Sequence, residues 1–202
     1  MNAVSSDHRK YQLKARAERQ RQTRERIVAA TVALHREVGP AKTTVTDVAR
    51  RAGVQRLTVY NNFPRLSDLL AACQQAFLGG SPPPDIAPPG SSRDGSLELE
   101  AALRRLYRWY RANADMERNV HRDRALVHEL DALLRGSLDS RLDAAALGYA
   151  RLLARGRASV TRARSLIRLA LDFGTWELLD RQGIRDSQMA AMMVGSVQRI
   201  GS

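Results

Sequence analysis

Residues 45–63 read VTDVARRAGVQRLTVYNNF, and a single glycine interrupts their helical spacing of apolar residues. One helical face carries Val45, Val48, Ala49 and Ala52. Gly53 then permits the left-handed backbone at which a helix stops, and a short basic helix is expected from about Gln55 to Asn61. A helix, a tight turn and a second short helix form a helix-turn-helix, whose second helix enters the major groove of DNA. The stretch therefore predicts a DNA-reading motif.

The flanking sequence predicts a helix on either side of this motif. The upstream helix would begin near Thr23, which can cap it, and end at the Gly39–Pro40 pair. Its inward face would carry Ile27, Ala30, Leu34 and Val38. At the start of the motif, Thr44 and Asp47 have the spacing of a capping box, with Asp in place of the usual Glu. The downstream helix is expected over about 67–78.

Positive charge is concentrated near this motif. The chain of 202 residues carries a formal charge of +12 at pH 7. Residues 1–80 contribute +8 of it, from 14 basic and 6 acidic residues. A general preference for arginine, with 30 Arg and only 3 Lys, can explain the total but not the asymmetry. Such a concentration favours a polyanionic partner, because neutralised phosphates release their counterions.

Proline divides the chain into parts. Five of the seven prolines lie in SPPPDIAPPGSSRDGS, residues 81–96, which cannot be a helix interior and is expected to be an extended or mobile linker. Outside this linker the apolar spacing is helical nearly throughout, so the expected fold class is all-α. The expected organisation is a basic N-terminal arm (1–22), a helix-turn-helix domain (23–80), the linker (81–96) and a helical C-terminal domain (97–202).

Several classes of protein and site are disfavoured. Cys73 is the only cysteine, so no intrachain disulfide can form. The sequence has no apolar leader and no run of roughly 20 apolar residues, the length of a spanning helix, so a cytoplasmic protein without membrane contact is the simplest interpretation. His121 and His128, seven apart, are a poor metal signature. Because no phosphate-binding glycine loop, nucleophile elbow or apolar pair of carboxylates is found, neither an enzyme nor a cofactor is expected.

The string RERIVAATVALHREVGPAKTTVTDVARRAGVQRLTVYNNFPRLSDLL, residues 24–70, resembles the N-terminal domain of TetR-type transcriptional regulators. The resemblance rests on Gly39, on the paired Thr43 and Thr44, on DVARRAGV, and on TVYNNF where the family usually has TLYxHF. It covers under a quarter of the chain. It is nevertheless specific, because the whole ordered string matches and not one short pattern.

The sequence departs from the family pattern at several positions. Gln55 stands where Ser is common, Leu57 where Gly is common, and Asn62 where His is usual. The usual SKE is RLS here, so the family's phosphate-contacting lysine falls on Leu66, which cannot serve. Arg65 beside it is the candidate that could take over this contact.

Carried over by position, the resemblance implies a set of DNA-contacting residues. Base reading falls on Arg56, Leu57, Thr58 and Tyr60, with Asn61 beside them. Phosphate contact falls more weakly on Thr43, Thr44 and Arg51, and the set is completed by Asn62 and Arg65. The chemistry agrees, because an arginine can bind guanine O6 and N7 together and an apolar group can touch a thymine methyl. The alternative role, simple core packing, is preferred for Val59 and Phe63.

The N-terminal arm allows two interpretations. Its basic residues are Arg9, Lys10, Lys14, Arg16, Arg19, Arg21, Arg24 and Arg26. Such an arm can follow the DNA backbone or enter a minor groove. A solvated, disordered leader fits the sequence equally well.

The resemblance implies that the C-terminal domain binds a small effector and forms a dimer. Effector candidates are the aromatic residues Tyr107, Tyr110, Tyr149, Phe173 and Trp176, because ligand pockets are largely apolar and aromatic; the alternative is core packing. Residues 166–180, taken as one helix, are apolar over an arc wide enough to be buried on two sides. The dimer candidates are Ile167, Ala170, Leu171, Gly174, Leu178, Met189, Met193 and Val197. This helix and the terminal helix expected to carry Met189, Met193 and Val197 could instead both be buried within one subunit.

The residues and the resemblance together predict a ligand-responsive DNA-binding transcriptional regulator. In this interpretation a homodimer binds a palindromic operator as a repressor and is released by a small molecule. The alternative is a helical interaction or scaffold protein that uses the helix-turn-helix for protein contact. Salt dependence distinguishes the two, because binding through phosphates weakens steeply as salt rises.

Overall fold

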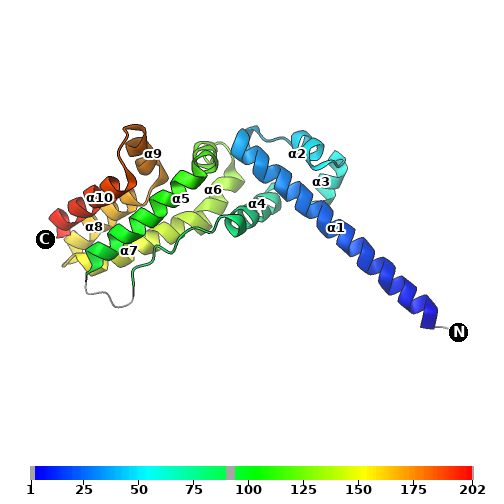
Figure 1. The fold of residues 1–202 in the computed structure, drawn as a ribbon, viewed down its shortest axis with the longest axis horizontal. Helices are drawn as coiled ribbons and strands as arrows, with labels where there is room; N and C mark the ends of the chain where they lie inside the picture. The colour runs from blue at the N-terminus through cyan, green and yellow to red at the C-terminus, as the bar shows by residue number, and fades with distance from the viewer. Residues whose placement is uncertain (1–2, 90–93, 202) are drawn as a thin grey trace. The chain divides into compact units, whose positions relative to one another are not determined.

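The computed structural model describes residues 3–89 and 94–201, with side chains described over 12–89 and 94–199. Within these ranges every regular element is a helix (Figure 1). The prediction of an all-α fold is therefore confirmed. The chain divides between Gly80 and Ser81 into two compact units.

The first unit, as far as it is described, contains four α-helices and one 3-10 turn. These are α1 (Ala3–Glu37), the 3-10 turn Pro40–Lys42, α2 (Val45–Ala52), α3 (Arg56–Asn62) and α4 (Leu66–Gly80). α1 packs against α2 and α4, and α3 packs against α2. The core between these helices contains Ile27, Val28, Ala30, Leu34, Val48, Ala49, Ala52, Val59, Phe63, Leu69 and Cys73.

Local hydrogen bonds fix the turn between α2 and α3. Thr44 caps α2, since its Oγ1 accepts a hydrogen bond from the Asp47 amide at 3.1 Å and donates one to Asp47 Oδ2 at 2.5 Å. Gly53 ends α2 in the left-handed conformation, at φ 66° and ψ 41°, where a side chain would be strained. Gln55 occupies the N-cap position of α3 without a side-chain hydrogen bond. The predicted cap and glycine turn are confirmed.

α1 is longer than the sequence analysis predicted. Thr23 does not begin the helix, which is continuous from Ala3. Its 35 residues are about 52 Å long at 1.5 Å per residue. Residues 12–26 contain no glycine or proline and are rich in Ala, Gln, Arg and Glu, which favour helix without any cap at residue 23. Val38, expected on the inner face, lies past the end of the helix and is 39% exposed.

The second unit is a bundle built around a long, kinked helix. Its described elements are α5 (Gly95–Asp123), α6 (His128–Leu134), the π-helical turn Arg135–Asp139, α7 (Ser140–Leu153), α8 (Arg157–Ala170), α9 (Phe173–Arg181) and α10 (Asp186–Gly201). α8 packs against α7 and α10, while α5 packs against α9 and α10. α5 leaves helical geometry at Asn113, where φ is −121° and ψ is 16°. The side-chain amide of Asn113 donates to the Trp109 carbonyl at 2.9 Å.

The prediction of a single helix over 166–180 is wrong, because α8 ends at Ala170 and α9 begins at Phe173, with Leu171 and Asp172 between them. The Asp172 carboxylate accepts hydrogen bonds from the amides of Gly174 at 2.9 Å and Thr175 at 3.3 Å, and so caps the start of α9. Aspartate is among the residues most preferred at an N-cap, because its carboxylate accepts hydrogen bonds from the first free amides of the helix. Ala170 and Gly174 therefore lie on different helices and do not form one close-approach surface.

The described part of the proline-rich segment is packed against the second unit and is not a mobile linker. Ile86 is only 1% exposed and belongs to the core of this unit. The Trp109 indole donates to the Ser81 carbonyl at 3.1 Å, and Arg105 donates to the Asp85 carbonyl at 3.2 Å. The expectation of mobility is thus wrong for 81–89, because one apolar side chain among the prolines anchors them. Residues 90–93 of the expected linker lie outside the described residues.

Candidate nucleic-acid interface

The exposed side of α3 is the candidate for reading DNA. Val59 and Phe63 are buried, at 2% and 4% exposure, which confirms their prediction as core residues. The side chains that face away from this core are Arg56, Leu57, Tyr60 and Asn61. At about 100° per residue these four lie within an arc of about 140°. Two of them are large and apolar yet open, with Leu57 65% and Tyr60 47% exposed. The burial of Val59 and Phe63 in the core thus determines which side of α3 is exposed to solvent.

Arg56 is the most available cation of this face. It is the first residue of α3, its side chain is exposed, and it has no hydrogen-bond or ion-pair partner among the described residues. An arginine at the beginning of the second helix is well placed to meet base edges. Thr58, in contrast, is half-buried, and its carbonyl accepts a hydrogen bond from Asn62 Nδ2 at 2.8 Å. Thr58 and Asn62 are therefore less accessible to DNA than the four exposed residues of α3.

Arg24 holds the other end of α3 against α1, a role that the sequence analysis did not identify. Its Nη1 donates to the Asn62 carbonyl at 2.8 Å. Its guanidinium carbon lies 4.0 Å from the centroid of the Phe63 ring, in cation–π geometry. A cation that binds the last carbonyls of a helix is favourable. No local sequence pattern indicates this contact, because the partners are 38 residues apart.

The two threonines that were expected to contact phosphates form hydrogen bonds within the first unit. The Thr43 hydroxyl donates to the Gly39 carbonyl at 2.8 Å, and the Thr44 hydroxyl donates to Asp47. A hydroxyl has a single hydrogen, so neither can donate to a phosphate while these bonds persist. Both threonines therefore support the fold around the motif.

Two arginines among the expected phosphate contacts are paired with carboxylates at the surface. Arg51 binds Glu37 at 2.7 Å, and the hydrogen bond lowers the pKa of that carboxyl. Arg65 binds both oxygens of Asp68, at 3.0 and 2.7 Å, and lowers its pKa in the same way. Exposed pairs of this kind contribute little stability. Either arginine can therefore exchange its carboxylate for a phosphate at small cost.

The structure brings four of the five effector candidates together in the core of the second unit. Tyr110, Phe173 and Trp176 form an aromatic cluster with ring centroids 5.3 to 5.9 Å apart. Tyr107 and Tyr110 donate their hydroxyls to the carbonyls of Ala170 and Leu171, at 2.8 and 2.7 Å. These bonds tie α5 to the junction between α8 and α9.

Tyr149 lies away from this aromatic cluster. Its hydroxyl donates to the Glu98 carbonyl at 3.4 Å. Glu98 precedes Tyr110 by 12 residues on α5, which is about 18 Å along the helix axis. The five aromatic candidates therefore do not form a single site.

A polar pair, the half-buried His121 and the buried Glu117, lies beside the aromatic cluster and was not predicted as part of it. The His121 ring stacks on Phe173 with 5.2 Å between centroids, and its buried Nε2 has no hydrogen-bond partner among the described residues. Glu117, 6% exposed, places Oε2 3.5 Å from this Nε2. Ligand pockets combine apolar walls with a few polar groups of this kind. The i,i+4 spacing on one helix is the sequence signal that could have indicated the pair.

The expected dimer residues divide into enclosed and open positions. Enclosed by their own chain, with at most 1% exposure, are Ile167, Ala170, Leu171, Met189 and Val197. Met193 is half-buried, Gly174 is exposed, and Leu178 is 59% exposed. Other open apolar side chains on these helices are Leu169, 51% exposed, and Met192, 50% exposed. Only open positions can contact a second subunit directly.

Within the described residues, no three His, Cys, Asp or Glu side chains are grouped so that they could hold a metal ion. No described helix combines the length and the hydropathy that crossing a bilayer requires.

The chain is similar to known proteins both in sequence and in fold. Residues 27–73 match the family profile described as bacterial regulatory proteins, tetR family. A tetR-family transcriptional regulator from Streptomyces coelicolor is 20% identical with a TM-score of 0.61, and the alignment covers 89% of this chain and 80% of that one. A TetR transcriptional regulator from Rhodococcus sp. RHA1 is 22% identical with a TM-score of 0.44, covering 91% and 97%. No curated protein matches the chain. The Streptomyces structure shares the fold over most of the chain.

Proposed function

We propose that this chain, which belongs to the TetR family of bacterial regulatory proteins through its N-terminal unit, is a cytoplasmic repressor that binds a palindromic operator as a dimer. The observation that carries the proposal is the exposed side of α3, where Arg56, Leu57, Tyr60 and Asn61 face away from a core formed by Val59 and its neighbours. A helix-turn-helix uses this side to meet base edges in the major groove.

Each exposed group of α3 has a chemical counterpart on DNA. Arg56 can donate two parallel hydrogen bonds to guanine O6 and N7, and Leu57 can contact a thymine methyl. Tyr60 and Asn61 can bond to bases or phosphates. Arg51 and Arg65 supply sequence-independent affinity by exchanging their carboxylates for phosphates. The same face could in principle contact a protein, but a basic unit with an open arginine favours a polyanion.

The open apolar residues of the second unit support the proposed dimer. Leu169 on α8, Leu178 on α9 and Met192 on α10 are each about half exposed or more. Burying such side chains against a second copy removes apolar area from water at about 25 cal/mol per Å². Two subunits related by a two-fold axis would place two α3 helices in half-sites about one DNA turn apart, which is about 34 Å.

We also propose that the small-molecule effector binds at the aromatic cluster. Tyr110, Phe173 and Trp176 supply apolar walls, and the Glu117 carboxylate and the buried His121 Nε2, which has no hydrogen-bond partner among the described residues, supply polar anchors. A ligand there would disturb the Tyr110 hydrogen bond to the junction of α8 and α9. Because that junction adjoins the proposed dimer surface, its shift would change the spacing of the two reading helices and so the affinity for DNA.

Selection from a pool of random duplexes tests the repressor proposal. The wild-type protein should enrich a palindrome whose half-sites are about one helical turn apart. Its affinity for the enriched duplex should fall steeply as salt rises. Failure to enrich any motif would contradict the proposal, and binding without a salt slope would favour the scaffold alternative.

A further inference from the structure

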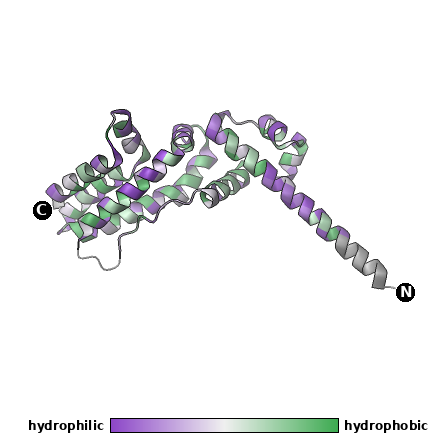
Figure 2. Cartoon of the chain, in the orientation of Figure 1, coloured by the Kyte–Doolittle hydropathy of each residue, from purple (hydrophilic) through white to green (hydrophobic). Residues whose placement is uncertain are grey.

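The described side chains of α1 that precede Ile27 lie outside the core of the first unit. The backbone is helical from Ala3, yet the first buried side chain among those described is Ile27. Residues 12–26 are exposed except for the half-buried Ala15 and Thr23. The 24 residues before Ile27 are about 36 Å long, close to one turn of B-DNA, about 34 Å. Figure 2 shows this part of α1 as mainly hydrophilic where it is coloured.

The acidic residues of this segment and three of its arginines lie on different sides of the helix. Residues 12–26 contain six basic and two acidic residues. The acids Glu18 and Glu25 are both bound by Arg21, at 2.6 and 2.5 Å. Arg16, Arg19 and Arg26 have no carboxylate partner among the described residues. At about 100° per residue these three lie within an arc of about 80° that contains neither acid. We call them the arginine arc.

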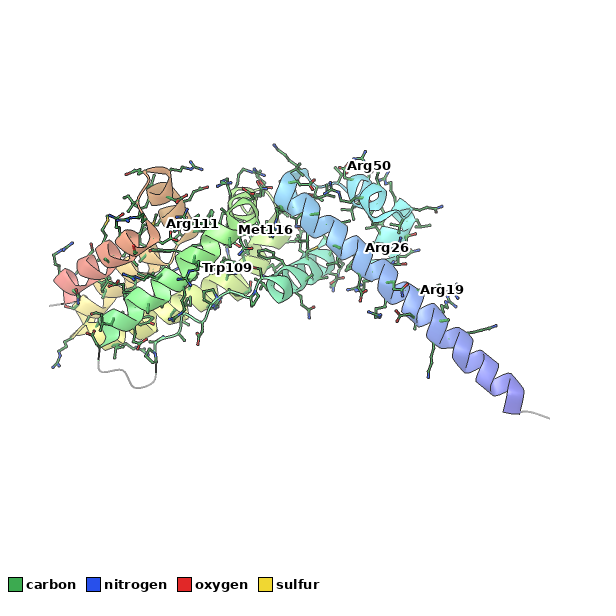
Figure 3. The ribbon with its side chains drawn as sticks, viewed as in Figure 1. Arg19, Arg26, Arg50, Trp109, Arg111 and Met116 are labelled. Carbon is green, nitrogen blue, oxygen red and sulfur yellow. The ribbon has the colours of Figure 1, made fainter. Side chains whose placement is uncertain are left out.

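The arginine arc begins beside the helix-turn-helix. Arg26 Nη1 lies 3.8 Å from the position that a Cβ on Gly53 would occupy, next to the turn that leads into α3. Arg24, two residues earlier, holds the far end of α3. Arg19 and Arg26 project from α1 two turns apart (Figure 3). Arg16 and Arg19 are about 10 to 15 Å farther along the axis than Arg26. The arc therefore continues outward from the DNA-reading part of the same unit.

We propose that the arginine arc is a second DNA-binding surface, which binds phosphates of the duplex beside the half-site that α3 reads. The inference rests on the proposed function and adds a partner surface to it. A row of guanidinium groups without carboxylate partners on a helix is complementary to a row of phosphates. Its contribution is independent of sequence, because phosphates position a protein without specifying bases. An exposed helix with little packing also gains stability when its mutually repelling arginines are neutralised.

The test compares two double variants of the full chain that remove equal charge from the same helix. Arg16→Gln with Arg19→Gln removes two members of the arc, and Lys14→Gln with Arg21→Gln removes two cations from the acidic side. Gln retains nearly the helix propensity of Lys and Arg. Affinity is measured by fluorescence anisotropy over a range of salt, on the duplex that the wild type enriches and on a longer duplex of mixed sequence.

The arc variant should lower the slope of log affinity against log salt by about 1.8 per subunit, or about 0.9 per lost phosphate contact. The control should change it by less than half as much. Arg16→Lys with Arg19→Lys, which keeps both charges, should restore the slope and exclude a general loss of fold. Equal effects of the arc and control variants, in a wild type that does bind DNA, would overturn the inference. A wild type that binds neither duplex would instead overturn the proposed function.

Discussion

Replacing Ile86 with alanine tests whether the proline-rich segment is part of the second unit. The side chain is 1% exposed and lies in the main core of that unit. Ile→Ala in a core removes buried carbons and leaves a cavity, at a typical cost of 2 to 5 kcal/mol, so we expect about 3 kcal/mol. Ile86→Val should cost only about 1 kcal/mol. A mobile linker would show neither effect.

Urea unfolding followed by tryptophan fluorescence measures this cost directly. The only two tryptophans, Trp109 and Trp176, both lie in the second unit, so the signal reports the unit in question. Ala87→Ser, at the exposed neighbouring position, is the matched control and should stay within about 0.5 kcal/mol of wild type. A loss below about 0.5 kcal/mol for Ile86→Ala would refute the reasoning that this side chain anchors 81–89.

Three further predictions concern the reactivity of Cys73 in the first unit, the association of the dimer and the acid stability of the second unit. Burial raises the pKa of Cys73 to about 12, so its thiol should react with a disulfide reagent at pH 8 only as fast as the first unit opens; rapid reaction in the folded protein would contradict this. Leu178→Glu should shift sedimentation toward the monomer, whereas Leu126→Glu, at an open position outside α8 to α10, should not; equal effects would argue against the proposed surface. Burial acts to raise the pKa of Asp186, but hydrogen bonds led by Arg111 lower it overall. Its contribution to stability is therefore present above the unfolded pKa of about 3.9 and is lost as pH falls through the folded value. Asp186→Asn should flatten the acid side of the unfolding profile of the second unit, and an unchanged profile would contradict the assignment.

The helix-turn-helix could be predicted because its signals are local. Thr44 and Asp47 are three residues apart, and Gly53 permits the left-handed backbone that the turn between α2 and α3 requires. Apolar spacing likewise assigned Val59 and Phe63 to the core and left the opposite side of α3 open. Arg56 accordingly lies exposed at the start of α3, and its contact with a base stays a prediction.

The features that the sequence analysis missed depend on contacts between distant segments. Ile86 is a single apolar residue among prolines, and only the core that it enters shows that its segment is packed. The burial of Ile167 likewise depends on neighbouring helices, because the apolar wheel is the same for a core and for an interface. The break at Asp172 is the exception, because its cap is formed by the nearby amides of Gly174 and Thr175. The contact of Arg24 with Asn62 joins residues 38 apart. Spacing along one helix carries no information on such partners.

The central claim is that α3 reads bases through Arg56, and the base preference of Arg56→Ala tests it most directly. Random-duplex selection is run on the wild type, on Arg56→Ala and on Arg50→Ala, which removes the same charge from α2. The account predicts that Arg56→Ala flattens the preference at one position in each half-site and costs about 1 to 3 kcal/mol per half-site on the wild-type operator. Arg50→Ala should leave every base preference intact. A selected motif for Arg56→Ala that is identical to that of the wild type would contradict the account.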